Sequence, residues 1–354
     1  MAGKKKDRQA RRSGAHVTLI ILFALLFATV IFSLAIGRYP IPVLRTARIL
    51  LALILPDSSP RSEHWNEEEW IVVQIVRLPG VILAASAGAG LALSGAVLQS
   101  LFRNPLVAPQ IIGISSGASF RGVLAILLGF SSYGIVAAAF AFGLFSMILV
   151  FGLSRLAGKT GILSVVLSGI IVGGMFSAFV GLTEYLADPD RNLPTIIHWL
   201  MGSFVGADWR KTAILGIPAA VAGIMLLLMR WRINLLSLGD TDSAALGVPV
   251  NNLRWLCLGL VSLIVAAQVS VSGGVGWVGL VIPHFARMMV GSDHRKLLPV
   301  SALMGAIYLL LMDDLARTLI SQEIPIGILT AIVGTPVFGF IFWKTQARGW
   351  ASHD

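Results

Sequence analysis

Long apolar runs alternate with short polar segments along almost the whole chain of 354 residues. The runs lie at about residues 17–36, 72–99, 111–129, 134–154, 162–183, 212–230, 253–272, 276–291, 298–320 and 325–343. A membrane-spanning helix needs roughly 20 predominantly apolar residues, so each run fits one crossing. Several runs contain Gly or Pro, which membrane helices tolerate where neighbouring helices satisfy the freed backbone groups. The pattern predicts an all-α polytopic membrane protein with about ten transmembrane helices.

The composition excludes an ordinary soluble domain. Hydrophobic residues make up 56% of the chain and charged residues 12%, with a mean hydropathy of +0.85, whereas soluble domains carry about 25% charged residues. The one cysteine, Cys257, lies within an apolar run, so neither an intrachain disulfide nor a cysteine metal cluster is available. The net charge of +10 would suggest nucleic acid in a soluble chain, but here the cations are scattered between apolar runs. We expect them to set membrane orientation and predict no nucleic-acid partner.

The first apolar run follows a basic segment and could be a secretory signal. It is longer than a typical signal core of roughly 7 to 15 residues, and no clear small-residue cleavage site precedes Arg38. We therefore expect a first transmembrane helix. The predicted layout is a basic cytoplasmic N-terminus at 1–16, a single membrane domain at 17–343 and a cytoplasmic tail at 344–354. Within the domain, residues 39–70 form an outer loop with a short surface helix around Pro42 to Leu55.

The distribution of charges supports this orientation. With a cytoplasmic start and ten crossings, 17 of the 27 Lys and Arg fall on the inner side and nine on the outer side, and Arg121 falls within a span. Five of the 17 acids are inside, which gives about +12 inside and −3 outside. Lys and Arg are enriched in cytoplasmic loops, so both termini are predicted to be cytoplasmic.

Three segments match motifs for phosphate binding, dinucleotide binding and serine hydrolysis, and we reject all three matches. Gly152 to Gly158-Lys159-Thr160 has five residues where a phosphate-binding loop needs four, and it follows a membrane helix instead of a strand. Gly274, Gly276 and Gly279 spell the dinucleotide fingerprint without a βαβ unit, which favours close helix packing or a re-entrant turn. Gly113-Ile114-Ser115-Ser116-Gly117 matches a hydrolase nucleophile elbow, but its spacing is also that of a small-residue packing face, which we favour.

Four other stretches are more specific in order and spacing. They are Arg77-Leu78-Pro79 through Arg103-Asn104-Pro105-Leu106 to Gly117-Ala118; His198-Trp199-Leu200-Met201-Gly202-Ser203 with Asp208-Trp209-Arg210; Leu238-Gly239 with Leu246-Gly247; and Gly276 through Pro283-His284 and Glu323-Ile324-Pro325-Ile326-Gly327 to Gly334-Thr335-Pro336. This set resembles the FecCD-type permeases, the membrane subunits of binding-protein-dependent ABC importers for iron-siderophores, haem and vitamin B12. The resemblance covers roughly residues 70 to 343.

The resemblance implies the fold of a vitamin B12 importer permease and a set of partners. These are a second permease copy or close homologue, two cytoplasmic ABC ATPase subunits and a periplasmic substrate-binding protein, in the bacterial inner membrane. It implies a transport subunit without its own nucleotide site, not an enzyme. No cofactor is expected. His284 stands without other ligands at metal spacing, so we predict no metal site.

The same resemblance assigns a coupling role to the inner segment 231–252, which has an apolar start and two Leu-Gly pairs. We expect one or two short helices that press against an ATPase; a solvated loop is the alternative. The expected contacts are Leu235, Leu238, Gly239, Asp240, Leu246 and Gly247. Ser243 stands where the family usually has alanine.

Two outer arginines, Arg77 and Arg317, match positions where the family presents cations to acidic residues of the binding protein; headgroup anchoring is the alternative. Such pairs steer encounter more than they add affinity. Gly80 replaces the last arginine of the family's Arg-x-Pro-Arg pattern, and the acidic loop Glu63 to Glu69 opposes an acidic partner. Asp313 and Asp314 lie within a helical turn of Arg317 and are expected to pair with it as a structural lock.

Arg121 lies inside an apolar run, where an arginine costs several kcal/mol unless it faces a polar cavity or a partner. It either lines the pathway of an anionic substrate or pairs within the bundle, for example with a carbonyl near Gly113 to Gly117. By resemblance the pathway lies between two copies and is lined by the fifth and tenth spans, at about 162–182 and 325–342.

The predicted function is permeation of an iron complex, a ferric siderophore or haem, by alternating access driven by the separate ATPase. A cobalamin or oxyanion importer is the alternative. An ion-coupled secondary transporter is disfavoured because mid-membrane acids are scarce. A membrane enzyme is disfavoured because no convergent catalytic set is present.

Overall fold

The computed structural model describes residues 2–37, 39–54, 65–156 and 161–350, and within these ranges the chain is helical without strands. The elements in chain order are α1 (Ala2–Ala35), α2 (Val43–Ile54), α3 (Glu67–Ile71), the π-helix η1 (Val72–Arg77), α4 (Leu78–Leu101), the 3₁₀-helix η2 (Pro109–Ile112), α5 (Ile114–Leu127), α6 (Ser132–Leu156), α7 (Ile162–Leu186), α8 (Leu193–Leu200), α9 (Trp209–Leu228), α10 (Arg230–Leu236), α11 (Asp240–Ala245), α12 (Val250–Ser272), α13 (Val278–Val290), α14 (His294–Thr318) and α15 (Ile326–Trp350). The predicted all-α class is confirmed.

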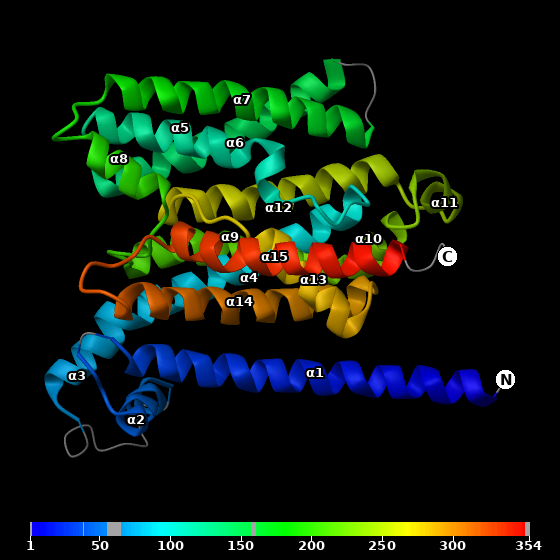
Figure 1. The fold of residues 1–354 in the computed structure, drawn as a ribbon, viewed down its shortest axis with the longest axis horizontal. Helices are drawn as coiled ribbons and strands as arrows, with labels where there is room; N and C mark the ends of the chain where they lie inside the picture. The colour runs from blue at the N-terminus through cyan, green and yellow to red at the C-terminus, as the bar shows by residue number, and fades with distance from the viewer. Residues whose placement is uncertain (1, 38, 55–64, 157–160, 351–354) are drawn as a thin grey trace.

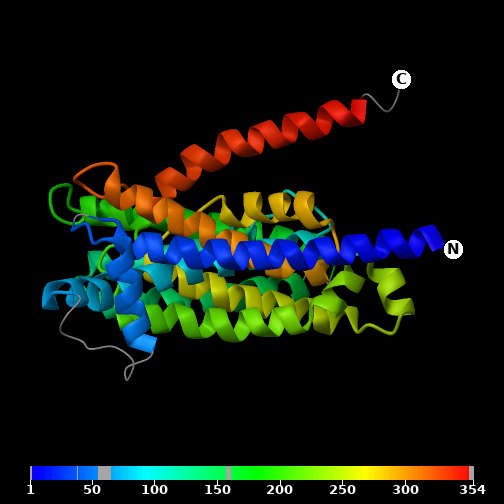
Figure 2. The ribbon, with the colours of Figure 1, turned by 90° about the horizontal axis from the view of Figure 1, so that it is seen from below.

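The long helices lie side by side along one axis and form a bundle (Figure 1). The start of α1, the end of α15, α10 and α11 gather at one end of the bundle, and α2, α3 and α8 gather at the other. We name these the inner and outer ends, after the orientation that the charges predict. The predicted surface helix is α2, which lies across the bundle axis at the outer end (Figure 2).

A helix occupies each of the ten apolar runs. Seven helical stretches in the described part of the chain are long and apolar enough to cross a membrane, and three apolar helices are shorter. The shortest, α13, has 13 residues, which corresponds to about 20 Å against a hydrocarbon core of roughly 30 Å. The chain is therefore a multi-pass membrane protein, while the count of ten crossings and the side of the termini stay predictions.

Two helices extend beyond the predicted membrane domain, whose boundaries stay predictions. Helix α1 begins at Ala2 and continues without a break through the predicted N-terminal segment 1–16. Helix α15 runs to Trp350, past the predicted end of the membrane domain at residue 343. Lys, Arg and Gln favour helices intrinsically, so a membrane helix that they flank can extend beyond the apolar run.

Helix α4 lies at the centre of the bundle, and most of its residues are buried on every side. Glycines let its backbone touch two neighbours directly. An ideal Cβ on Gly95 would lie 1.8 Å from the carbonyl oxygen of Gly279 in α13, and one on Gly88 would lie 2.1 Å from that of Gly305 in α14. Small residues at such contacts are how membrane helices pack without a hydrophobic driving force between them. The packing interpretation of Gly279 in the rejected dinucleotide motif is thereby confirmed.

The glycines of the rejected nucleophile motif also pack against neighbouring helices. A Cβ on Gly113 would approach the carbonyl oxygen of Gly169 in α7, and one on Gly117 would approach Ser146 in α6. Ser146 in turn donates a hydrogen bond to the carbonyl of Gly113 at 2.9 Å. These contacts confirm a packing face. The rejected phosphate-loop match ends at Gly158-Lys159-Thr160, which lie outside the described residues.

Helix α15 is attached to the bundle mainly at its outer end. The backbone N–H groups of Ile326 and Gly327 donate to the carbonyls of Gly202 and Met201 at 2.9 and 3.0 Å. Towards the inner end, α15 diverges from the other helices (Figure 2), and Ile332 and Phe340 are exposed. An apolar helix face that stands away from its own bundle is available to lipid or to another chain.

Candidate functional site

The inner segment 231–252 contains two short helices, α10 and the shorter α11, as the sequence predicts. Ile233 and Leu236 of α10 are fully or almost fully buried in the main core cluster, so the segment is anchored to the bundle by its apolar face. It extends from the inner end without being part of a span.

Each Leu-Gly pair of this segment forms a turn that exposes its leucine. Gly239 and Gly247 have φ values of +118° and +78°, a backbone conformation that side chains other than glycine adopt only with strain. The preceding leucines, Leu238 and Leu246, are 54% and 60% exposed. Two exposed leucines on a segment outside the apolar runs form an apolar surface suited to a protein partner.

Two polar contacts fix α11 between α10 and α12. Asp240 accepts two hydrogen bonds from one guanidinium nitrogen of Arg254, at 2.7 and 2.8 Å, and Arg254 is buried. The hydroxyl of Ser243 donates to the carbonyl of Leu235 at 2.8 Å. The serine that stands in place of the family's usual alanine therefore ties the two short helices together. Asp240, a predicted ATPase contact, is thus also bonded to Arg254, which sequence spacing did not suggest.

At the outer end, the guanidinium of Arg77 is buried against the end of α1. It donates to the carbonyls of Leu34 and Ala35 at 2.7 and 3.1 Å, and to that of Tyr39 at 2.5 Å. The last carbonyls of a helix have no partner within the helix. The carbonyl of Ala35 also accepts from the backbone N–H of Ile41 at 3.2 Å, and Arg77 supplies a charged donor to all three carbonyls. The docking prediction supposed an exposed side chain here, whereas Arg77 is 7% exposed; docking itself stays a prediction.

Arg317 forms the predicted lock with two acids. It pairs with Asp313 at 2.9 Å and with Asp314 at 2.5 Å, and both carboxylates are buried. Asp314 also accepts a hydrogen bond from Ser33 of α1 at 2.6 Å. Charges removed from water are tolerated when they are paired and hydrogen-bonded, and this network joins the outer ends of α1 and α14.

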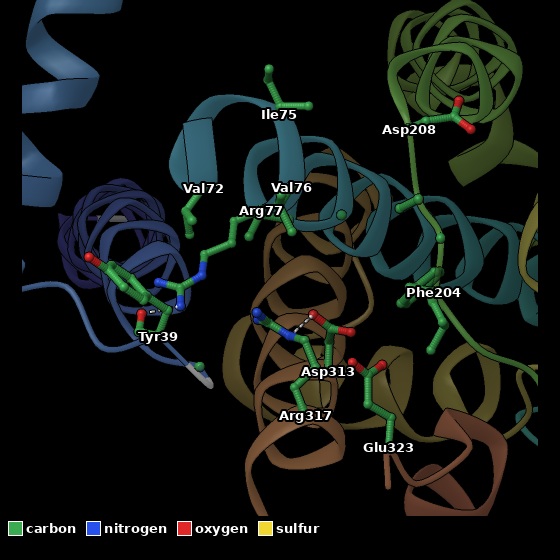
Figure 3. Close-up of a pocket in the computed structure, with 16 residues that line it drawn as sticks. Tyr39, Val72, Ile75, Val76, Arg77, Phe204, Asp208, Asp313, Arg317 and Glu323 are labelled. Atoms are coloured by element: carbon green, nitrogen blue, oxygen red, sulfur yellow. Dashed lines mark hydrogen bonds and ion pairs between the residues drawn. The ribbon is translucent and has the colours of Figure 1, made fainter. Parts of the chain in front are cut away.

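A cavity of about 560 Å³ opens beside these groups at the outer end (Figure 3). Its apolar wall includes Val72, Ile75, Val76, Val81, Phe204 and Val205. Arg77, Asp208, Asp313, Arg317 and Glu323 also line it. The structure thus brings both predicted docking arginines to one cavity, between the start of the second span and the end of the ninth.

The acidic outer loop is only partly available for contacts. Glu63 lies outside the described residues. Glu67 and Glu68 are exposed, whereas Glu69 is buried and pairs with Arg45 of α2 at 2.9 Å. Glu69 also accepts from the backbone of Asn66, so it caps the helix that leads into η1. One of these acids therefore has a structural partner that the sequence analysis did not identify.

Arg121 of α5 is half-buried, and its guanidinium carbon lies 5.4 Å from the centre of the Phe142 ring of α6. A cation over an aromatic face is stabilised by the ring quadrupole, by roughly 0.5 to 2 kcal/mol depending on desolvation. The ring of Phe142 belongs to a group with Phe120, Phe145 and Phe176. Arg121 therefore has a partner within the bundle, although a ring and not a carbonyl.

Comparisons with known proteins agree over nearly the full length. A family model described as the FecCD transport family matches residues 24–344. The molybdate import system permease of Haemophilus influenzae is 45% identical over 93% of this chain and 96% of its own. A permease of Helicobacter pylori described as part of an iron chelatin transport system is 42% identical over 78% and 83%. A solved structure of a metal-chelate type ABC transporter in an inward-facing conformation shares 44% identity and a TM-score of 0.81, over 92% of this chain and 98% of that one.

Proposed function

Since the chain belongs to the FecCD transport family and is thus an ABC importer permease, we propose that it works in a bacterial inner membrane with three kinds of partner. Two cytoplasmic ATPase subunits bind its inner end, a periplasmic binding protein docks on its outer end, and a second permease copy completes the pathway. The residues of the inner segment carry the first of these contacts.

The observation that best supports the ATPase contact is the pair of Leu-Gly turns. Leu238 and Leu246 are exposed at the inner end, while Ile233 and Leu236 of the same segment are buried in the core. A segment that is anchored on one side and apolar on the other transmits a displacement from a bound partner to the bundle. Leu235, Gly239, Asp240 and Gly247 shape this surface, by the turns and the Arg254 pair described above.

We assign different roles to the two outer arginines. The side chain of Arg317 is 18% exposed and lines the outer cavity, so an acidic side chain of the binding protein has access to it. The side chain of Arg77 has its donors committed to three carbonyls, so it shapes the cavity by holding the end of α1. Rim charges affect the association rate and its salt dependence more than affinity, so slower association of the binding protein at high salt supports the assignment of Arg317.

The proposed pathway lies against α7 and α15. The exposed face of α7 includes Gly174 and Gly181, where a Cβ added to the backbone would meet no other part of the described structure within 4 Å. The inner half of α15 stands away from the bundle (Figure 2). Both faces suit contact with a second copy around a central passage. The proposal places Arg121 beside α7, because its ring partner Phe142 also contacts Phe176 of α7.

The proposed cargo is an iron complex, either a ferric siderophore or haem. The relative from Helicobacter pylori supports this class, since its name places it in an iron chelatin system. The relative from Haemophilus influenzae favours a second candidate, an oxyanion such as molybdate, with 45% identity over almost the full length of both chains. Both cargoes are anionic or carry anionic groups, so the proposed role of Arg121 is compatible with either.

Uptake into vesicles tests both the mechanism and the cargo. The chain would be reconstituted with its ATPase and binding protein, and labelled ferric siderophore, haem, cobalamin and molybdate would be compared. Uptake of an iron complex that requires ATP and the binding protein supports the proposal, and uptake of molybdate alone selects the second candidate. Uptake driven by a proton gradient without either partner would exclude the ABC mechanism.

A further inference from the structure

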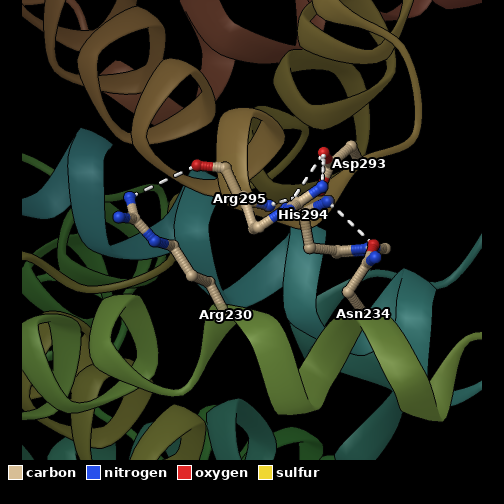
Figure 4. Close-up of polar contacts among 5 residues, drawn as sticks. All are labelled: Arg230, Asn234, Asp293, His294 and Arg295. Carbon is tan, nitrogen blue, oxygen red and sulfur yellow. Dashed lines mark hydrogen bonds and ion pairs between the residues drawn. The ribbon is translucent and has the colours of Figure 1, made fainter.

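Helix α10 is joined to the first turn of α14 by a set of polar contacts that the sequence analysis did not anticipate (Figure 4). Arg230 and Asn234 are four residues apart, so they share one face of α10. The Arg230 side chain reaches the backbone of Arg295, and the Asn234 side chain reaches His294, both in the first turn of α14.

The oxygen of the Asn234 side chain accepts two hydrogen bonds from His294. The backbone N–H of His294 donates to Oδ1 at 3.1 Å, and its Nδ1 lies 3.0 Å from the same atom. A backbone N–H can only donate, which identifies this atom of the amide as the oxygen. Nδ1 must then carry the hydrogen of the imidazole, because the amide oxygen cannot donate. His294 is buried, so these two bonds are shielded from water.

Arg230 fills a gap that a proline creates in α14. Pro299 has no N–H, so the carbonyl of Arg295, four residues earlier, lacks its usual helical partner. A guanidinium nitrogen of Arg230 donates to that carbonyl at 3.3 Å. The side chain of Arg295 lies over the ring of Trp231, 5.1 Å from its centre, and pairs with Asp293 at 2.8 Å. Contacts from α10 thus replace hydrogen bonding that α14 cannot supply for itself.

Helix α14 extends from this junction to the outer cavity. Its inner end carries His294, and its outer end carries Asp313, Asp314 and Arg317. In between, its backbone touches that of α4 at Gly305 and Gly88. A helix held at both ends and packed backbone to backbone at its middle moves as one body with its neighbour, because there is no flexible side chain between them to absorb a displacement.

We propose that Asn234 and His294 are positioning residues for ATP-driven transport: their hydrogen bonds transfer the displacement of the coupling segment to α14. The inference rests on the proposed function, in which an ATPase acts on residues 231–252. Neither residue needs to touch the ATPase or the cargo, because their part is to keep α10 and α14 engaged while the ATPase moves α10.

Two substitutions at Asn234 separate this role from simple structural support. Asn234→Leu has a similar volume and lacks the acceptor, whereas the matched control Asn234→Asp keeps an acceptor oxygen. The readout is the ratio of binding-protein-stimulated to basal ATP hydrolysis in the reconstituted complex. A merely structural defect reduces the amount of folded complex, so it lowers the stimulated and the basal rate by the same factor. Loss of the contact between α10 and α14 lowers the stimulated rate alone, and with it the ratio.

A typical buried hydrogen bond contributes about fivefold to an equilibrium constant. We therefore expect Asn234→Leu, which loses two bonds, to lower the ratio by about 25-fold, and His294→Leu, which keeps the backbone bond, by about fivefold. The double variant should match Asn234→Leu alone, because its bonds are the same ones. Asn234→Asp should stay within about twofold of the native ratio.

Retention of the native ratio in both Leu variants, or loss in Asn234→Asp equal to that in Asn234→Leu, would overturn the proposal. If Asn234→Leu does not yield a monodisperse complex with the ATPase, the ratio measured for His294→Leu tests the proposal by itself, since that variant leaves Asn234 in place. Failure of the proposed function would be visible separately, as a native complex with no ATP-dependent uptake.

Discussion

The direct backbone contact between α4 and α13 predicts a strong effect of a single methyl group. An ideal Cβ on Gly95 would lie 1.8, 2.6 and 2.8 Å from the O, C and Cα atoms of Gly279, whereas ordinary contact begins at 3.4 Å. Gly95→Ala therefore requires the two helices to separate by about 1.6 Å, because backbone atoms on both sides cannot rotate out of the way.

Overpacking of this kind costs typically 1 to 3 kcal/mol, and we expect about 3 kcal/mol here, or roughly a 100-fold change in the unfolding equilibrium. Gly216→Ala in α9 is the matched control, because a Cβ added there would meet no neighbouring helix or side chain of the described residues within 4 Å. It should be neutral or stabilise the helix by up to about 1 kcal/mol. Unfolding of the purified protein in detergent with increasing denaturant, followed by tryptophan fluorescence, measures both variants. Equal stability of the two variants would refute the close-packing argument.

Four further outcomes are expected. Leu238→Glu should leave the chain folded but abolish stimulated ATP hydrolysis, because a charge replaces an apolar contact; unchanged stimulation would contradict the assignment of the coupling segment. Arg121→Ala should reduce uptake of the anionic cargo with assembly intact and Arg121→Lys should retain it, whereas loss of assembly in the alanine variant would show that the cation–ring contact is structural. Arg77→Leu removes the guanidinium that donates to three carbonyls, of which that of Ala35 keeps a backbone donor, the N–H of Ile41. The variant should destabilise the fold by roughly 2 kcal/mol in thermal unfolding, whereas native stability would argue against the role of Arg77 at the end of α1. Asp293 has a pKa below its ordinary value because Arg295 donates hydrogen bonds to its carboxylate, so Asp293→Asn should lower stability at neutral pH. The stability difference between the variant and the native protein should vanish as the pH falls through that lowered pKa, because a carboxylate with a depressed pKa loses its stabilising contribution when it is protonated. A stability difference that is independent of pH would exclude the charge of Asp293 as its cause.

The sequence by itself determined where the helices are and which contacts are local. Each of the ten apolar runs contains a helix, because membrane length and the absence of water around the backbone leave a helix as the available structure for such a run. The pairing of Arg317 with Asp313 and Asp314 was also predictable, because residues three and four apart on a helix face one another. The two short helices in segment 231–252 followed from the turn-forming glycines.

Only the tertiary structure decided which partner each polar side chain takes across the bundle. Arg77 bonds to carbonyls about 40 residues earlier, and Asn234 bonds to His294, 60 residues later. Sequence periodicity records which face of a helix is apolar but not which helix lies against it, so neither contact could be inferred from spacing. The same limit applies to Arg121, whose ring partner on α6 follows from how α5 and α6 pack. The sequence placed the charged residues along the helices, and helix packing selected their partners.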